Sequence, residues 1–152
     1  MPKARGRHSP AKAQRLLRRA MLALIVAACL SALAAPAAAG SYMDRAWLLI
    51  AEGSRANEFL GKRLYDRELA RVVGQAAEGR LQAAKVTQVP REVELAHPHL
   101  LLMLEHYERA AAAAALGELP RYFEHSRAAQ DEEQLFRSIL RQLGWTLPSG
   151  KS

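Results

Sequence analysis

The sequence predicts an all-α protein, a small up-and-down helical bundle that follows an N-terminal apolar segment. Residues 40–152 are dominated by Ala, Leu, Arg and Glu, which all favour helix. No stretch alternates apolar and polar residues as a half-buried strand does, and β-branched residues are few. Prolines at 90, 98, 120 and 148 divide this part into lengths that suit helices. Four helices are the economical arrangement, and three helices are the alternative.

The N-terminal segment has the composition of a secretory signal peptide. Residues 1–20 contain seven Lys or Arg and no Asp or Glu, and residues 21–35 are almost wholly apolar. Small residues and a proline follow, and they end in three alanines before Gly40. A basic start, an apolar centre and an A-x-A end are typical of a signal peptide. We therefore expect cleavage between Ala39 and Gly40, which would release the domain 40–152 as an exported, periplasmic or secreted protein.

Two alternatives for this segment remain open. Residues 20–39 are just long enough to span a bilayer, so an uncleaved segment would anchor the domain to the inner membrane. The second alternative depends on Cys29, the only cysteine of the chain. The Val-Ala-Ala-Cys sequence that ends there resembles the lipobox of bacterial lipoproteins, in which the thiol is acylated. That resemblance implies a lipid-anchored protein that begins at Cys29.

The charge distribution argues against nucleic acid as a partner. The net charge of +7 resides in residues 1–39, because residues 40–152 contain 15 Lys or Arg and 15 Asp or Glu. A domain without net charge has no overall field to attract phosphate. Residues 40–152 also lack cysteine, which excludes disulfides, Cys-ligated zinc and covalently bound c-type haem from the domain.

Two helices are predicted in the first half of the domain. Ser41 is a suitable N-cap for the first, and Gly61 is a suitable end. The second begins at about Lys62. Its predicted apolar face consists of Tyr65, Leu69, Val72, Val73 and Ala76. Because only one glycine separates the two, a single helix over 42–85 is the alternative. Residues 86–96 are the clearest linker.

Two further helices are predicted to form an antiparallel hairpin. Pro98 begins the third helix, Gly117 ends it, and Pro120 begins the fourth. The apolar stripe of the third helix contains Leu100, Met103, Leu104, Tyr107, Ala110 or Ala111, and Ala114, widened by Leu101 and Leu102. The apolar residues of the fourth are Tyr122, Phe123, Phe136, Ile139, Leu140 and Leu143. The capping-box-like pair Asp131 and Gln134 predicts a kink or restart in its middle. Gly144 ends it, and residues 145–148 form a tail that can fold back on the bundle.

Three histidines of this hairpin are candidate metal ligands. His99 and His106 are seven residues apart and share one helix face. His125 lies on the antiparallel partner, and we expect it about one turn from His106. Imidazoles with a nearby carboxylate can bind a divalent metal. The sequence therefore offers a periplasmic metal or small-ligand carrier as an alternative function.

The segment His106–Ala110 resembles histidine-phosphotransfer domains. Those domains are helical bundles with an exposed histidine three residues before a lysine and four before a glycine. Here Arg109 and Ala110 occupy these two positions. The resemblance implies, as a weaker alternative, a phosphotransfer-like module.

The chain shows no sequence signal of catalysis. No serine has a nucleophile-elbow context, and the glycines do not cluster into a phosphate-binding loop. The run of six alanines over 110–115 is either helix-forming filler or a strip that a partner helix can approach closely. We therefore expect a non-enzymatic protein without a cofactor, acting by contact with a protein partner in the cell envelope or by self-association. Membrane contact would come only from an uncleaved or lipidated N-terminal segment.

Overall fold

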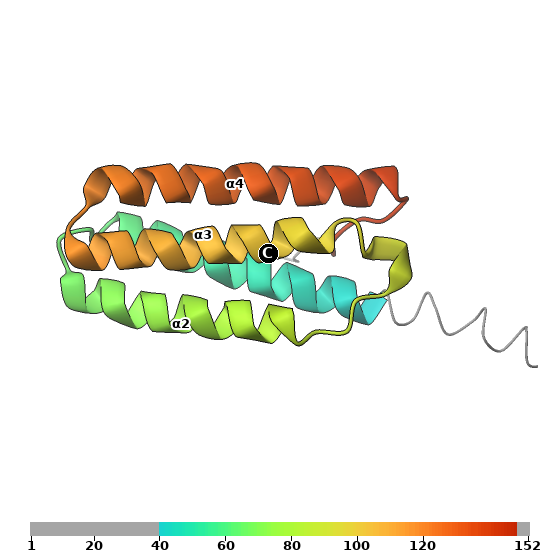
Figure 1. The fold of residues 1–152 in the computed structure, drawn as a ribbon, viewed down its shortest axis with the longest axis horizontal. Coiled ribbons are helices and arrows are strands. Elements are labelled where there is room, and N and C mark those ends of the chain that lie inside the picture. Colours follow the sequence, from blue (N-terminus) through green and yellow to red (C-terminus); the bar gives the residue numbers. More distant parts are fainter. Residues whose placement is uncertain (1–39, 149–152) are drawn as a thin grey trace, which may run out of the picture. The chain divides into compact units, whose positions relative to one another are not determined.

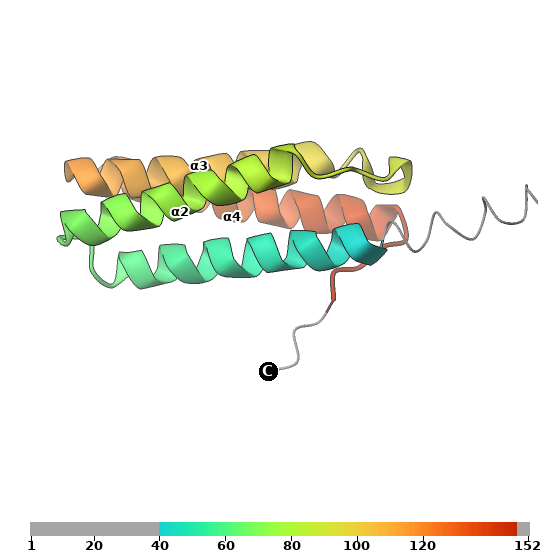
Figure 2. The same cartoon turned by 90° about the horizontal axis from the view of Figure 1, so that it is seen from below.

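The computed structural model of the chain describes residues 40–148, which form four antiparallel helices (Figure 1). The first helix covers residues 40–61, and α2 (Arg67–Lys85) runs back beside it (Figure 2). A linker with the short 3₁₀ helix η1 (Arg91–Val93) leads to α3 (His97–Leu116) and then α4 (Leu119–Gln142). No strand occurs within 40–148. The predicted all-α up-and-down bundle is confirmed, and the single long helix over 42–85 is wrong.

Helix α2 begins later than the sequence predicts, at Arg67 instead of about Lys62. The first helix ends at Gly61 as predicted, but a turn over residues 62–65 follows it. The N-cap of α2 is Asp66, whose Oδ1 accepts a hydrogen bond of 2.9 Å from the backbone N–H of Leu69. Ser41 also differs from its predicted role, because it already lies inside the first helix. Local cap chemistry thus fixes the boundary that apolar spacing missed.

The hairpin of α3 and α4 follows its predicted boundaries closely. Gly117 ends α3 in the left-handed conformation, with φ of 81°, which a residue without a Cβ adopts at little cost. The predicted restart at Asp131 is wrong, since α4 is continuous through it. The tail after α4 does fold back. The backbone N–H of Trp145 donates a hydrogen bond of 2.8 Å to the Leu140 carbonyl, and the Trp145 and Leu147 side chains pack against the core.

The core is built mainly on α3. Its predicted stripe is buried at Leu100, Met103, Leu104, Tyr107, Ala110, Ala111 and Ala114, whereas Leu102 is 40 % exposed. On α4, Tyr122, Phe136 and Leu140 are buried and Phe123 is exposed. The predicted face of α2 is partly wrong, because Tyr65 and Val72 are exposed and Leu69 and Val73 are half-buried. The residues of α2 that are buried are Ala70, Ala77, Leu81 and Ala84.

Small residues let the helices approach closely. A Cβ added at Gly53 of the first helix would lie 3.0 Å from the Tyr107 ring, and one added at Gly74 would lie 3.6 Å from the Ala111 Cβ. Four residues of the alanine run, 110, 111, 113 and 114, are buried. The run therefore serves the packing of the bundle itself. Among residues 40–148, no helix combines the length and the apolar character that a membrane crossing needs.

Candidate functional site

His106 and His125 meet on the seam between α3 and α4. Their Nδ1 atoms are 3.3 Å apart, and their ring centroids are 5.5 Å apart with the planes tilted by 31°. The structure thus places the two imidazoles in direct contact, closer than the one turn expected. Both rings are half-buried, so one edge of the pair is open to solvent. Two neutral imidazoles form such a contact when one Nδ1 carries a proton and donates it to the lone pair of the other.

His99 lies further along the same seam and has a different partner. Its Nδ1 is 2.7 Å from Oε2 of Glu132. His99 precedes His106 by seven residues and Glu132 follows His125 by seven, so the two contacts are successive rungs of one antiparallel register. Seven residues of helix span about 10.5 Å. This separation keeps His99 apart from the histidine pair.

The three predicted metal ligands are therefore divided between two places. Among residues 40–148, no group of three or more His, Cys, Asp or Glu side chains is close enough together to hold a metal ion. The residue that matters for the phosphotransfer resemblance, Arg109, is bound to Glu105 one turn earlier in α3. His106 itself is bound to His125. Of the residues predicted at the N-terminal segment, Cys29 and Ala39 lie outside the described residues, and Gly40 is the first residue of the first helix.

A third histidine contact joins the first helix to α3 and was not predicted as a site. The Tyr42 hydroxyl and the His97 Nδ1 are 3.0 Å apart, with the rings edge to face at 5.8 Å. Burial raises the pKa of the Tyr42 phenol and lowers the pKa of the His97 imidazole, since both charged forms lose hydration. Both shifts favour the neutral pair. No sequence signal links two residues that are 55 positions apart.

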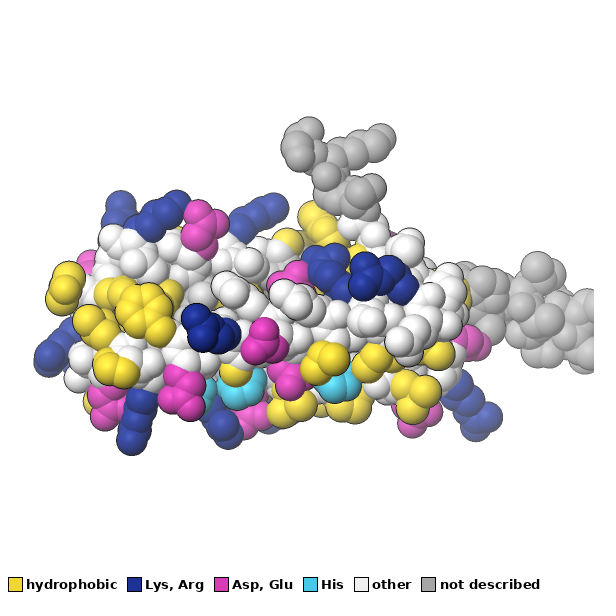
Figure 3. All heavy atoms as spheres, turned by 90° about the horizontal axis from the view of Figure 1, so that it is seen from above, with side chains coloured by type: hydrophobic (Ala, Val, Ile, Leu, Met, Phe, Trp, Pro, Cys, Tyr) yellow, Lys and Arg dark blue, Asp and Glu magenta, His cyan; other side chains and the backbone are white. Residues whose placement is uncertain are grey.

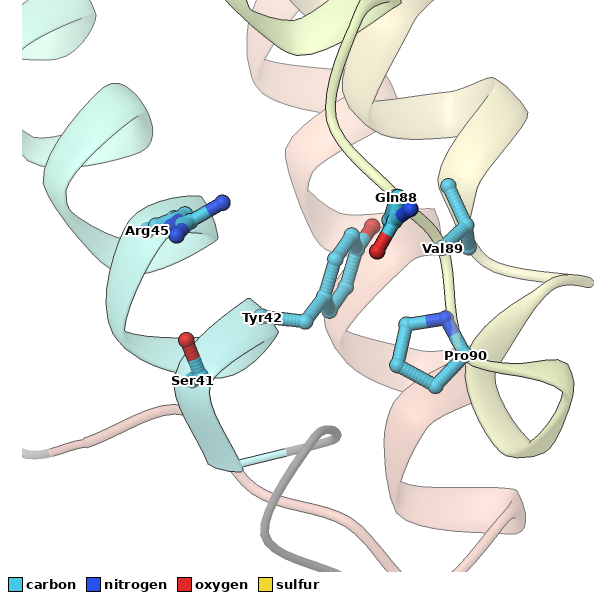
Figure 4. A pocket seen from close by; sticks show the side chains of 6 residues that line it. All are labelled: Ser41, Tyr42, Arg45, Gln88, Val89 and Pro90. Atoms are coloured by element: carbon cyan, nitrogen blue, oxygen red, sulfur yellow. The ribbon is translucent and has the colours of Figure 1, made fainter. Parts of the chain in front are cut away.

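A cavity of about 440 Å³ opens beside this contact. Figure 4 shows Tyr42 projecting from the first helix toward the linker before η1, with Ser41 and Arg45 on one side and Gln88, Val89 and Pro90 on the other. Among residues 40–148, the lining contains one charged side chain, that of Arg45, and one phenol, that of Tyr42, whose hydroxyl is bonded to His97.

The opposite end of the bundle carries a set of exposed apolar side chains, which we call the distal apolar end. It comprises Phe59, Tyr65, Leu116 and Phe123, with exposed fractions of 44 %, 90 %, 68 % and 58 %. They come from the end of the first helix, the turn before α2, the last residue of α3 and the first turns of α4, which all lie at the same end of the bundle (Figure 1). Hydrophobic side chains gather at this end in Figure 3. The Arg63 guanidinium stacks over the Phe59 ring at 4.4 Å.

The aromatic residues at this end are held by contacts between helices. The Tyr122 hydroxyl donates to the Asn57 carbonyl at 2.9 Å, and the Tyr122 ring meets Phe123 edge to face at 5.2 Å. The Ser126 hydroxyl bonds to the Asn57 side chain at 3.1 Å. Phe123 is thus an exposed ring on a rigid base. Phe123 is one of the apolar residues predicted for the fourth helix, and its type alone does not distinguish an exposed ring from a buried one.

Comparisons of the chain with protein families, with curated proteins and with solved structures found no match.

Proposed function

We propose that the chain is an exported helical-bundle protein that acts without catalysis, by protein–protein contact in the cell envelope. The observation that carries this proposal is the distal apolar end. Large apolar residues exposed together mark interaction surfaces, and interfaces are enriched in Tyr and Phe. Aromatic side chains bury much area on binding and lose little rotamer entropy. Three of the four residues at this end are aromatic.

The position of this end suits a module that is either released or tethered. Gly40, where the first helix begins, lies at the other end of the bundle (Figure 1). A helix of 22 residues is about 33 Å long, so the distal apolar end is about that far from Gly40. Cleavage after Ala39 would leave all four helices intact. Retention of residues 1–39 as an anchor, or acylation of Cys29, would tether the domain through Gly40, the residue farthest along the first helix from the distal apolar end.

Photo-crosslinking in the native host tests the proposal. A photoreactive amino acid at Tyr65 should give a discrete adduct with a partner protein or a second copy, and Phe123→Asp should abolish that adduct. The matched control position is Val86, an apolar residue at the C-cap of α2 that is 82 % exposed and lies at the opposite end of the bundle. Absence of an adduct at Tyr65, or the same adducts at both positions, contradicts the proposal. So does a turnover by the purified protein that His106→Ala abolishes.

Intact mass measured on the soluble and membrane pools of the same cells decides how the module is presented. A soluble species that begins at Gly40 corresponds to a released domain. A membrane species of full-length mass corresponds to an anchor, and one that begins at an acylated Cys29 to a lipoprotein. Full-length protein confined to the cytoplasm would contradict export.

A further inference from the structure

We propose that His106 and His125 together form a binding site for a divalent late transition-metal ion, such as Cu²⁺, Ni²⁺ or Zn²⁺. The inference goes beyond the proposed docking function and depends on different side chains. His106 lies ten residues before Leu116 on α3 and His125 lies two residues after Phe123 on α4, and none of the four apolar side chains of the distal apolar end is a ligand. Failure of one proposal therefore leaves the other intact.

The separation of the two nitrogens matches that of two ligands on one metal ion. Metal–nitrogen bonds to imidazole are about 2.0–2.1 Å long for zinc. Two Nδ1 atoms 3.3 Å apart, each about 2.05 Å from one ion, would subtend an angle of about 107° at that ion, close to the tetrahedral value. The ion would replace the proton that the two rings share. Rotation about the side-chain bonds would aim both lone pairs at it.

The scaffold holds this geometry before a metal arrives. His106 lies in the middle of α3 and His125 in the second turn of α4, and the two helices are joined by a link of only two residues. The rings are half-buried, which restricts their rotamers, while their open edge leaves room for water as the remaining ligands. The two arginines one turn away are engaged by carboxylates, Arg109 by Glu105 and Arg121 by Glu118. These ion pairs moderate the local positive charge that would oppose a cation.

The chemistry selects the class of ion. Neutral imidazole is a ligand for Zn²⁺, Ni²⁺ and Cu²⁺, whereas Mg²⁺ and Ca²⁺ prefer oxygen ligands. With two protein ligands the site follows the general affinity order, so Cu²⁺ should bind most tightly of the three. His99 takes no part, because Glu132 occupies it two turns away. It is the natural control on the same seam.

The test uses the full chain without a histidine tag, with Cys29→Ser in every sample so that the leader thiol cannot bind the ion. Thermal unfolding and calorimetric titration are measured with Cu²⁺, Ni²⁺, Zn²⁺ and Mg²⁺. We expect the first three ions to raise the melting temperature and Mg²⁺ to leave it unchanged. The variants His106→Asn and His125→Asn should lose most of the shift and bind Cu²⁺ at least about tenfold more weakly. His99→Asn should keep both.

A second measurement does not depend on the variants. Paramagnetic Cu²⁺ added in substoichiometric amounts should broaden the NMR signals of the His106 and His125 rings before those of His97 and His99. Metal-free melting curves establish that each variant is folded. No shift with any of the three ions, an equal shift in the His106→Asn, His125→Asn double variant, or broadening centred elsewhere would overturn the site.

Discussion

Two glycines in helix interiors should respond differently to replacement by alanine, because only one of them faces a neighbouring side chain. At Gly53 an added Cβ would lie 3.0 Å and 3.2 Å from two carbons of the Tyr107 ring, whereas at Gly79 of α2 nothing lies within 4 Å. Tyr107 is 5 % exposed, so its ring has little room to withdraw. Helix propensity favours alanine over glycine by about 1 kcal/mol at both positions. Overpacking at Gly53 costs about 1–3 kcal/mol.

Helix propensity and steric overpacking together therefore predict different changes in stability for the two glycine-to-alanine variants. Gly79→Ala should raise the free energy of unfolding by about 0.5–1 kcal/mol, while Gly53→Ala should leave it unchanged or lower it by up to about 2 kcal/mol. Equilibrium urea unfolding, followed by circular dichroism, measures both. With a slope of about 2 kcal/mol per molar urea, the 1–3 kcal/mol steric difference separates the midpoints by roughly 0.5–1.5 M. A Gly53→Ala variant as stable as Gly79→Ala would refute the close approach of the first helix to α3.

Two further predictions concern the core and the Tyr42–His97 contact. Phe136→Ala removes a ring with no exposed surface and should lower the free energy of unfolding by about 3–5 kcal/mol. Leu135→Ala, at a neighbouring position that is 47 % exposed, should lower it by about 0.5 kcal/mol or less. Equal urea midpoints for the two variants would contradict the burial of Phe136 in the core. Burial lowers the pKa of His97 below its ordinary value of 6.5, so below that pH the unfolded chain binds more protons than the folded one. Stability should therefore fall as the pH drops through and below 6.5, and His97→Gln should flatten that part of the pH profile measured by urea unfolding. A variant profile that overlays the wild-type profile would show that His97 titrates alike in both states.

The helix boundaries that the sequence predicted correctly are those set by local chemistry. Pro98, Gly117 and Pro120 act within one turn of the chain, and each lies within about one residue of its predicted role. The restart expected at Asp131 failed because the acidic residues there have a use inside a helix. Glu133, for example, accepts from Arg137 one turn later at 2.8 Å. A capping-box pattern and an exposed ion-paired helix face contain the same residues, and only the tertiary setting distinguishes them.

The buried face of α2 was predicted wrongly because hydrophobic periodicity treats valine as a stronger core residue than alanine. Helices that approach closely leave space only for small side chains, and the 3.6 Å contact expected between an added Gly74 Cβ and Ala111 shows how little space α2 and α3 leave. Alanines therefore line the buried side of α2, and Val72 is left outside. Such a choice depends on the partner helix, which the local sequence does not specify.

The histidines show the same limit of sequence-based prediction for a candidate binding site. Their spacing within α3 was readable, because seven residues return to the same face of a helix. The register between α3 and α4 could be predicted from the sequence only to within about one helical turn. A shift of one turn would separate the two imidazole rings that are in contact in the structure. The structure fixes that register through two rungs with the same spacing, His99 to Glu132 and His106 to His125. The metal site predicted from three histidines thus becomes, in our proposal, a two-imidazole site, and binding there would require this register to be kept. Any substitution that slides α4 along α3 should weaken metal binding even where it leaves both histidines in place.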